Sequence, residues 1–424
     1  MSEWQEHNLC DVADFVTDKI STSKVTLNNY ISTDNMQVDR GGVVPAATLP
    51  QASKFNHYKP TDTLFSNIRT YFRKVWLADR EGGASPDVLI FRTKNEKKLN
   101  PLYLYYLISG QEFVDFTVLT AKGAKMPRGD KDAMMQFKFH LPNPDEQIEI
   151  VEALRCIDQK IELNQRMNET LEWMARAIFK SWFVDFDPVH AKAEGLAPEG
   201  MDAQTASLFP HSFTDDGLPE GWTQESVISS AEYINGAAYK DMHFSKKPDA
   251  WPVVKIAELK NGISPQTKFT NTDLGHKFKL DTGDILFSWS GSPDTSIDTF
   301  IWTGGKGWLN QHIFKVVNKT RAERCFTYWL LKYLKPEFIE VARNKQTTGL
   351  GHVTRKDMEW MQYCKPDQPI LDLFYETVGL LLDQIENNLI QNQTLAALRD
   401  TLLPKLISGE LRVDATTETL KEAV

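Results

Sequence analysis

Residues 161–171 of the chain read IELNQRMNETL, and residues 385–395 read IENNLIQNQTL. Six of these eleven positions are identical at a spacing of 224 residues. A match also lies upstream of each copy, where DTLFS at residues 62–66 returns as DILFS at residues 284–288. Two further pairs keep nearly the same spacing: residues 112–114 with 337–339, and residues 131–132 with 356–357. Solenoid repeats span only a few tens of residues, so this period indicates a duplicated domain with two similar working surfaces.

Both copies lie inside long stretches with helical periodicity. Apolar residues recur at spacings of three and four in residues 145–184 and again in residues 367–408, which is a heptad pattern. We expect two spacer helices of about 38 residues, or roughly 57 Å each. Asparagines interrupt both seams at matching positions, and a buried asparagine lowers the stability of a seam but fixes its register. These residues are Asn164, Asn168, Asn388 and Asn392.

An antiparallel pair of these helices, related by a pseudo-twofold axis, would bring the two asparagine clusters together near the middle. The sequence therefore predicts a coiled-coil pair in which the asparagines hydrogen-bond with each other. The alternative is that each helix packs on its own domain as an ordinary amphipathic element. The predicted contact residues are Ile161, Asn164, Asn168, Leu171, Trp182, Phe183, Ile385, Asn388, Asn392, Leu395 and Leu406.

Outside the long helices, short strands and helices alternate irregularly. Residues 87–92 and 285–288 resemble strands, while residues 326–341 read as one helix. Without regular βαβ alternation, the fold class of each body is predicted to be α+β. The expected domains are residues 1–144 (first body), 145–184 (first spacer helix), 185–217 (linker), 218–366 (second body), 367–408 (second spacer helix) and 409–424 (polar tail).

Composition and cysteine usage favour a reduced, cytoplasmic protein. The 424 residues are 41% hydrophobic and 25% charged, which is ordinary for a globular protein. The first residues lack the basic start and apolar run of a signal peptide, and no apolar stretch approaches the length of a membrane span. Four scattered cysteines form no CxxC pair.

The net charge of −9 hides two basic regions. Residues 20–140 carry 17 Lys and Arg against 11 Asp and Glu, and residues 240–360 carry 19 against 13. Each body is therefore positive, while the helices, linker and tails are acidic. A local basic face, rather than the total charge, attracts phosphates, so both bodies are candidates for nucleic-acid binding.

The chain shows no catalytic constellation. It contains no Pro-Pro pair, so it lacks the Asx-Pro-Pro-aromatic loop that holds the target base in amino-methyltransferases. It also lacks a GxxxxGK[ST] phosphate loop, and its nine histidines do not have metal-ligand spacing. Pro86-Asp87 followed by Glu96-Lys97-Lys98 resembles a PD…ExK nuclease site, but Asn95–Pro101 reads as a turn and the second half has no counterpart. We interpret that match as chance.

Four loops carry the residue types that bind DNA. Residues 122–131 form a basic loop rich in Gly and Pro, and residues 343–356 form its partner in the second half. Residues 66–74 and 288–292 follow the shared strand and form a second pair of loops. Arg and Lys take phosphates, whereas Asn, Gln and Thr can also take base edges; the alternative for any single residue is a solvated charged loop. The candidate DNA-binding residues are Arg69, Tyr71, Arg73, Lys122, Lys125, Arg128, Lys131, Trp289, Ser290, Lys345, Gln346, Thr348, His352, Thr354 and Arg355.

Three motifs resemble a known family over nearly the whole chain. FKSWFVDFDPV at residues 179–189, LPEGW at residues 218–222 and LPKLISGEL at residues 403–411 are similar to the DNA-specificity subunit of type I restriction–modification systems. The resemblance implies two target recognition domains joined by two conserved antiparallel helices, with each domain reading one half of a split double-stranded DNA site. It also implies that the chain holds two methyltransferase subunits, with the helix residues named above as subunit contacts as well as helix-pair contacts, and that ATP-dependent restriction subunits join the full complex.

The same resemblance implies that the chain has no catalytic residues, metal or cofactor of its own. S-adenosylmethionine, ATP and Mg²⁺ are then expected on the partner subunits. Two other classes stay open from the residues alone. One is a self-contained DNA-modifying or DNA-cleaving enzyme, which the missing Pro-Pro loop disfavours. The other is a coiled-coil adaptor that does not bind DNA, which the two basic bodies disfavour.

Overall fold

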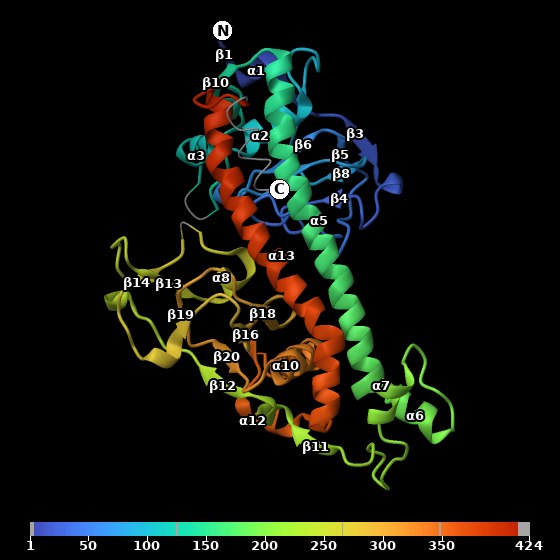
Figure 1. Cartoon of the computed structure of the whole chain (residues 1–424). Helices are drawn as coiled ribbons and strands as arrows, with labels where there is room; N and C mark the ends of the chain where they lie inside the picture. The colour runs from blue at the N-terminus through green and yellow to red at the C-terminus, as the bar shows by residue number, and fades with distance from the viewer. Residues whose placement is uncertain (1–3, 124–125, 265, 347–348, 414–424) are drawn as a thin grey trace. The chain divides into compact units, whose positions relative to one another are not determined.

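Figure 1 shows the computed structural model of the chain, which describes residues 4–123, 126–264, 266–346 and 349–413. The chain forms two compact units. Unit 1 consists of residues 1–161 together with residues 394–424, and unit 2 consists of residues 162–393. The boundary lies inside both long helices, because α5 is Pro144–Phe183 and α13 is Gln368–Ser408. Each unit therefore contains one segment of each long helix.

The main sheet of unit 1 has four antiparallel strands in the order β2-β9-β6-β7. All four residues of the central strand β6 are buried. Helix α2 packs against β6, β7 and β9, and the ring of Phe113 on α3 lies 5.7 Å from that of Phe65. The elements are β2 (Ala13–Phe15), β6 (Thr63–Ser66), β7 (Val75–Leu77), β9 (Val88–Thr93), α2 (Pro101–Ser109) and α3 (Gln111–Leu119).

A second, smaller sheet of unit 1 has the order β3-β5-β8-β4, in which only β4 and β8 are parallel. A separate antiparallel pair, β1 with β10, joins the start of the chain to the strand before α5. The elements are β1 (Gln5–Asn8), α1 (Leu9–Val12), β3 (Lys19–Ser21), η1 (Thr22–Lys24), β4 (Tyr30–Ile31), β5 (Lys54–Tyr58), η2 (Thr70–Phe72), β8 (Gly82–Ala84), α4 (Lys131–Met135) and β10 (Lys138–Leu141).

The main sheet of unit 2 is also four-stranded and antiparallel, in the order β12-β20-β16-β18. Its central strand β16 is fully buried, as β6 is in unit 1. The antiparallel pair of β11 with β22 matches β1 with β10 in its place along the chain. The elements are β11 (Thr223–Ser226), η3 (Val227–Ser230), β12 (Glu232–Asn235), β16 (Ile285–Ser288), β18 (Asp298–Ile301), β20 (Ile313–Val317) and β22 (Gln362–Lys365).

The smaller sheet of unit 2 has the order β14-β13-β19-β15. Its inner strand β19 has a parallel neighbour on one side, β13, and an antiparallel neighbour on the other, β15. The same arrangement occurs around one inner strand of the smaller sheet in unit 1. The fourth strand differs, because β14 joins the parallel neighbour whereas β3 joins the antiparallel one. The elements are η4 (Asp241–His243), β13 (Trp251–Val254), α8 (Ile256–Asn261), β14 (Phe269–Thr270), η5 (His276–Phe278), β15 (Lys279–Leu280), β17 (Ser290–Gly291), α9 (Pro293–Ser296), β19 (Gly307–Leu309), β21 (Gly351–His352) and α12 (Arg355–Trp360).

One expectation about helices needs correction. Residues 326–341 do not form one helix: α10 (Arg321–Tyr333) ends and α11 (Lys335–Asn344) begins around Leu334. Pro336 explains the break, since proline is tolerated in the first turn of a helix but not in its interior. The predicted linker, residues 185–217, contains the short helices α6 (Asp187–Ala193) and α7 (Ala203–Leu208).

The long helices run antiparallel within each unit. In unit 2, Asn164 donates to Oδ1 of Asn392 at 2.9 Å, and Asn388 donates to Oδ1 of Asn168 at 2.8 Å. In unit 1, Arg399 on α13 donates to Asp158 on α5 at 2.7 Å. The two amide pairs confirm the prediction that the asparagine clusters meet and hydrogen-bond.

Candidate nucleic-acid interface

In unit 1, two loops that lie more than forty residues apart in sequence form one surface. The amide of Arg69 donates to the carbonyl of Pro127 at 3.0 Å, and the amide of Gly129 donates to the carbonyl of Asn67 at 3.3 Å. The absence of a side chain at Gly129 favours this approach, because a Cβ there would lie 2.9 Å from Oδ1 of Asn67. The fold thus brings together the predicted loops 66–74 and 122–131.

Exposed cations and an aromatic pair stand on this surface. Arg69 and Lys131 are exposed, and Tyr71, 40% exposed, lies beside the ring of Phe72. Lys122 pairs with Asp130 at 2.5 Å, which raises the pKa of Lys122. Arg128 pairs with Asp87 at 3.1 Å. Exposed ion pairs of this kind are weak and screened by salt, so a phosphate can compete for both cations.

Arg73 does not belong to this surface, although the sequence made it a candidate DNA contact. Its side chain is 13% exposed and lies 3.3 Å from Asp39 and 3.9 Å from Asp400. Burial, followed by repulsion from Arg40, lowers the pKa of its guanidinium. A mostly buried arginine that already pairs with two carboxylates is poorly placed to contact a phosphate. Lys125, another candidate, lies outside the described residues.

The equivalent loops of unit 2 also pair. Ser290 faces His352 in the short antiparallel pair of β17 with β21, and the amide of Val353 donates to the carbonyl of Trp289 at 2.8 Å. Gly351 permits β21 to pass close to α11, because a Cβ there would lie 2.1 Å from the carbonyl oxygen of Ala342. The fold therefore places the loops 288–292 and 343–356 together, as it does their counterparts in unit 1.

Trp289 is half-buried at this junction. Its Nε1 donates to Oδ1 of Asn235 at 3.2 Å, and its ring lies 5.8 Å from that of Phe314 and 5.5 Å from that of His312. Burial lowers the pKa of His312, so its imidazole is neutral near pH 7 and offers hydrogen bonds rather than charge. A tryptophan held in this way can present a fixed apolar edge beside polar groups.

Several predicted residues of the second loop already have partners inside the protein. The Thr354 hydroxyl caps α12 by accepting from the amide of Asp357, and Lys345 pairs with the same carboxylate. Arg355 donates to the carbonyl of Tyr233 at 2.7 Å and stacks over Phe314. These groups order the loop, whereas Gln346 is exposed. Thr348 lies outside the described residues.

Sequence reasoning missed a surface on the smaller sheet of unit 2, which we call the lysine–aromatic surface. Lys255 and Lys268 lie 5.6 and 6.0 Å from the ring of Phe244. Lys279 and Lys306 lie 6.0 and 5.4 Å from the ring of Trp251. In the described chain, no carboxylate lies within 4.0 Å of the ammonium groups of Lys255, Lys268 or Lys306, while Lys279 pairs with Asp273. The surface is defined by Phe244, Trp251, Lys255, Lys268, Lys279 and Lys306.

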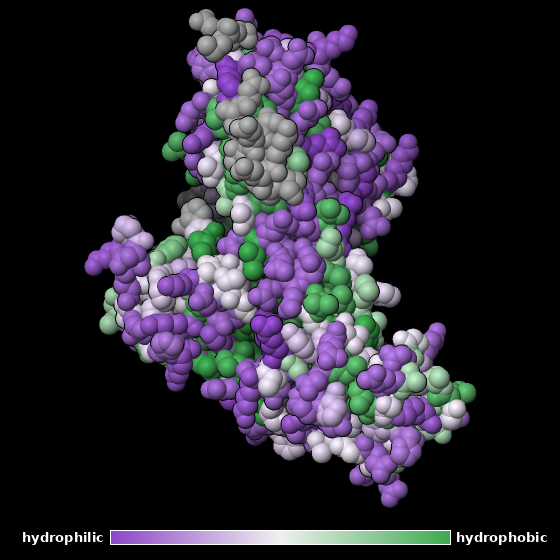
Figure 2. Space-filling view, viewed as in Figure 1, coloured by the Kyte–Doolittle hydropathy of each residue, from purple (hydrophilic) through white to green (hydrophobic). Residues whose placement is uncertain are grey.

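The signal for this surface was present in the sequence, because residues 240–280 hold eight lysines against four acids. Only the folded sheet shows that these lysines converge on aromatic rings. Figure 2 shows hydrophilic residues covering much of the part of unit 2 that contains β13, β14 and β19. Unpaired cations above aromatic faces are suited to nucleic-acid backbones.

A family model described as the type I restriction modification DNA specificity domain matches residues 1–173 and 219–362. The chain belongs to this family. Type I specificity subunits recognise DNA sequence and generally carry no catalytic site of their own.

Relatives support this assignment along the chain. The HindI specificity subunit of Haemophilus influenzae is 24% identical over 97% of this chain and 100% of its own length. The MjaIX specificity subunit of Methanocaldococcus jannaschii is 27% identical over 74% of this chain and 69% of its own. The crystal structure of a type I S subunit from M. genitalium aligns with a TM-score of 0.52 at 14% identity, covering 95% of this chain and 96% of that one. This last likeness concerns the fold.

The predicted contact residues of the long helices, assigned both to the helix pair and to other subunits, are mostly buried in the specificity subunit itself. Trp182 and Phe183 belong to the core of unit 2, where Trp182 packs on Phe209 and Phe374. Ile385, Leu395 and Leu406 are also buried, which suits contacts within the chain. Other apolar residues of the helices are exposed: Leu163, Met167, Trp173 and Met174 on α5 and Leu380 on α13. Figure 2 shows apolar residues gathered along α5 in unit 2.

No group of three or more His, Cys, Asp or Glu side chains in the described ranges is placed to hold a metal ion. None of the helices in the described part of the specificity subunit combines the length and apolar character that crossing a bilayer requires.

Proposed function

We propose that this specificity subunit reads a two-part double-stranded DNA target, with one half-site for each unit. One observation carries the proposal: both units assemble the same two chain segments into one surface. In each unit, the loop after the central strand of the main sheet pairs with the loop before a short helix, α4 or α12. Two similar surfaces on one chain suit a target with two separate halves.

An internal duplication accounts for this arrangement. The central strands β6 and β16 both lie between two antiparallel neighbours in four-stranded sheets. Helices α2, α3 and α4 have counterparts in α10, α11 and α12 along the chain. The family model also covers one long range in each half. We infer that one ancestral unit, with its long helix, was copied.

Within each surface we assign different work to different groups. Arg69, Lys122, Arg128 and Lys131 in unit 1 are proposed to neutralise phosphates, as is the lysine–aromatic surface in unit 2. Tyr71, Trp289, Ser290, Gln346 and His352 offer rings, hydroxyls and amides that can meet base edges. Lys345, Thr354 and Arg355 are proposed to order the second loop.

The long helices are proposed to scaffold the complex as a coiled-coil pair. Their shared seam is buried, whereas Leu163, Met167, Trp173 and Met174 leave an apolar strip of α5 exposed. Contiguous exposed apolar residues mark a docking surface. We propose that two methyltransferase subunits dock on the helices and that restriction subunits join them in the cytoplasm. S-adenosylmethionine, ATP and Mg²⁺ then bind to those partners, and the specificity subunit needs no cofactor.

Two experiments test the proposal. The purified chain, given DNA, S-adenosylmethionine, ATP and Mg²⁺, should neither methylate nor cleave. Activity that co-purifies strictly with this polypeptide would instead show a self-contained enzyme. A chain that supports complex assembly without any affinity for duplex DNA would be an adaptor.

The second experiment is methylome sequencing of a host that carries the complete system. It should reveal one motif with two specified halves separated by unspecified bases. Replacing residues 343–356 should change one half only, and replacing residues 122–131 should change the other. A single contiguous motif, or a change in both halves from either replacement, would contradict the assignment of one half-site to each unit.

A further inference from the structure

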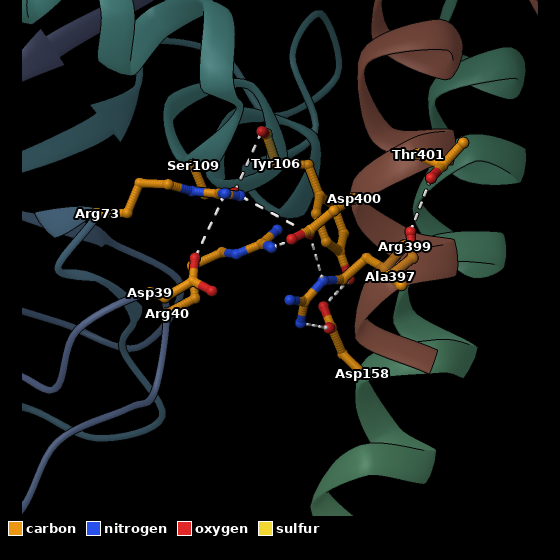
Figure 3. A network of polar contacts seen from close by, with 10 residues as sticks. All are labelled: Asp39, Arg40, Arg73, Tyr106, Ser109, Asp158, Ala397, Arg399, Asp400 and Thr401. Atoms are coloured by element: carbon orange, nitrogen blue, oxygen red, sulfur yellow. Dashed lines mark hydrogen bonds and ion pairs between the residues drawn. The ribbon is translucent and has the colours of Figure 1, made fainter. Parts of the chain in front are cut away.

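A network of ionic side chains connects the loop of residues 66–74 in unit 1 to helix α13 (Figure 3). We call this segment the recognition loop of unit 1. Arg40 donates to Oδ1 of Asp400, and Arg73 lies 3.9 Å from the same oxygen. Arg399 donates to Asp400 at 3.2 Å and to Asp158 on α5 at 2.7 Å. Asp400 is therefore the one carboxylate in Figure 3 that lies within reach of three arginines.

The two arginines that reach Asp400 from the sheet side come from loops with unusual backbone conformations. Six non-glycine residues in the described chain have a positive φ, and four of these are Asp39, Arg40, Arg69 and Arg73. Such conformations cost roughly 1 kcal/mol or more each and persist only where their surroundings enforce them. Two backbone hydrogen bonds join the loops. The amide of Asp39 donates to the carbonyl of Phe72 at 2.9 Å, and the amide of Arg40 donates to the carbonyl of Arg73 at 3.0 Å.

The turn held in this way is the one that presents the proposed DNA contacts. Arg69 and Arg73 flank the single helical turn η2, and Tyr71 and Phe72 project from it. Arg73 itself faces inward, as described above. A fixed position of this turn is needed if Tyr71 and Arg69 are to meet the same DNA groups each time.

Asp400 supplies the charge that the buried arginines need. The side chain of Arg40 is 1% exposed, and its Nε and Nη1 lack hydrogen-bond partners, as does Nε of Arg73. Burial alone would raise the pKa of Asp400, but Arg40, Arg399 and Arg73 hold it below its usual value, so the carboxylate is ionised. Without it, two adjacent buried guanidinium groups would repel each other around the exposed Asp39.

We infer that Asp400 is a positioning residue for DNA recognition, which holds the turn 69–73 in its binding conformation through Arg40 and Arg73. This inference rests on the proposed function, because it assumes that the turn contacts DNA. Asp400 itself stays on helix α13 and makes no DNA contact. Its effect on binding is indirect and passes through the buried guanidinium groups.

In the described part of unit 2, the position equivalent to Asp400 carries no acid. The residue 224 positions before Asp400 is Arg176, which is exposed. The corresponding loop is held by the β17–β21 pair and by the bond from Trp289 to Asn235 instead. Loss of the Asp400 charge should therefore affect recognition of one half-site and spare the other.

The test compares Asp400→Asn with Glu152→Gln, an exposed residue of α5 in the same unit. Hydrogen–deuterium exchange of the full chain without DNA should show faster exchange in residues 67–73 of Asp400→Asn, with protection elsewhere in unit 1 retained. Binding to duplexes that carry the methylome-defined target should weaken by about tenfold, as expected for losing a charge-assisted anchor. Discrimination should fall at one half-site only, and Glu152→Gln should match the wild type in every measurement.

A second variant, Arg40→Met, removes the other end of the anchor and should reproduce these effects. The double variant should bind no more weakly than the weaker single one, because both changes break one linkage. Unchanged exchange in residues 67–73 for both single variants would overturn the inference even if DNA binding were confirmed. Equal loss of discrimination at both half-sites would also overturn it. If the wild-type chain showed no half-site discrimination, the proposed function would be refuted. The exchange measurement would still test whether Asp400 holds the turn 69–73.

Discussion

The two units pack the same segments together with different side chains: polar and charged ones in unit 1, and apolar ones in unit 2. In unit 1, Asp158 on α5 accepts hydrogen bonds from Arg399 on α13 and from Tyr106 on α2, at 2.7 and 2.9 Å. The positions related to these by the repeat spacing in unit 2 are Leu382, Ala175 and Leu331. All three are buried in one apolar cluster.

The difference between the two triads separates stability from positional specificity. Apolar packing stabilises the helices of unit 2 without fixing a unique orientation of any polar group. An ionic network gives less net stability than its contacts suggest, but each hydrogen bond requires a defined geometry. The network lies where helix α13 also anchors the turn 69–73, so unit 1 gains a fixed connection between its helices and its recognition loop.

The largest effect should come from placing the acid of unit 1 into the apolar cluster of unit 2. Leu382→Asp buries a carboxylate without a partner and removes a core side chain, which should cost about 5 kcal/mol or more. Hydrogen exchange should show unit 2 opening while unit 1 keeps its protection. The conservative control Leu382→Met should leave stability almost unchanged. If Leu382→Asp unfolded at the same denaturant concentration as the wild type, position 382 would be solvated rather than buried.

Removing one partner of the unit 1 network should have the next largest effect. Arg399→Met leaves Asp158 without its cation and should destabilise unit 1 by about 2–3 kcal/mol, less than for a fully buried pair because Asp158 stays partly exposed. Chemical denaturation, monitored by hydrogen exchange of the amides in unit 1, measures this loss of stability.

The matched control copies the residues of unit 2 into unit 1, as Asp158→Leu, Arg399→Ala and Tyr106→Leu together. This triple variant should be close to the wild type in stability, because no unpaired polar group remains at the triad. A triple variant as unstable as Arg399→Met would show that the network contributes net stability rather than orientation.

The asparagine seam allows a comparison of a satisfied with an unsatisfied polar contact. Asn164 donates to Gln391 at 2.7 Å and to Asn392 at 2.9 Å. Asn164→Leu leaves both acceptors without this donor and should cost about 1–2 kcal/mol. Replacing all four asparagines by leucine should instead raise the melting temperature and loosen the register. A fall in melting temperature for the quadruple variant would contradict this account.

The smallest effects should come from the exposed cations, and they concern binding rather than stability. Lys268→Ala and Arg128→Ala should each reduce the slope of log Kd against log salt by about one if each residue neutralises one phosphate. Lys268 should give the larger loss of affinity, because Arg128 must first leave Asp87. Titrations of the target duplex at several salt concentrations measure both. Identical slopes in the wild type and both variants would remove these two residues from the DNA surface.

The local patterns of the sequence were sufficient for the long helices and the paired asparagines, because heptad spacing and the position of Asn164 are properties of the chain itself. The repeat also identified the four loops and predicted that they would occur in equivalent pairs. These loops are brought together by hydrogen bonds between distant backbone segments, such as that from Arg69 to Pro127.

What only the tertiary structure decided is which charged side chains remain free to bind. Arg73 and Arg69 look alike in the sequence, yet the side chain of Arg73 is only 13% exposed and lies 3.9 Å from Asp400, while Arg69 is exposed. Trp182 and Trp173 both stand on α5, but one fills a core and the other faces outward. Lys268 and Lys255 become a candidate phosphate site because β13 and β14 bring them to the ring of Phe244. Local spacing sets the face of a helix or strand, whereas burial and pairing depend on which distant segment packs against that face.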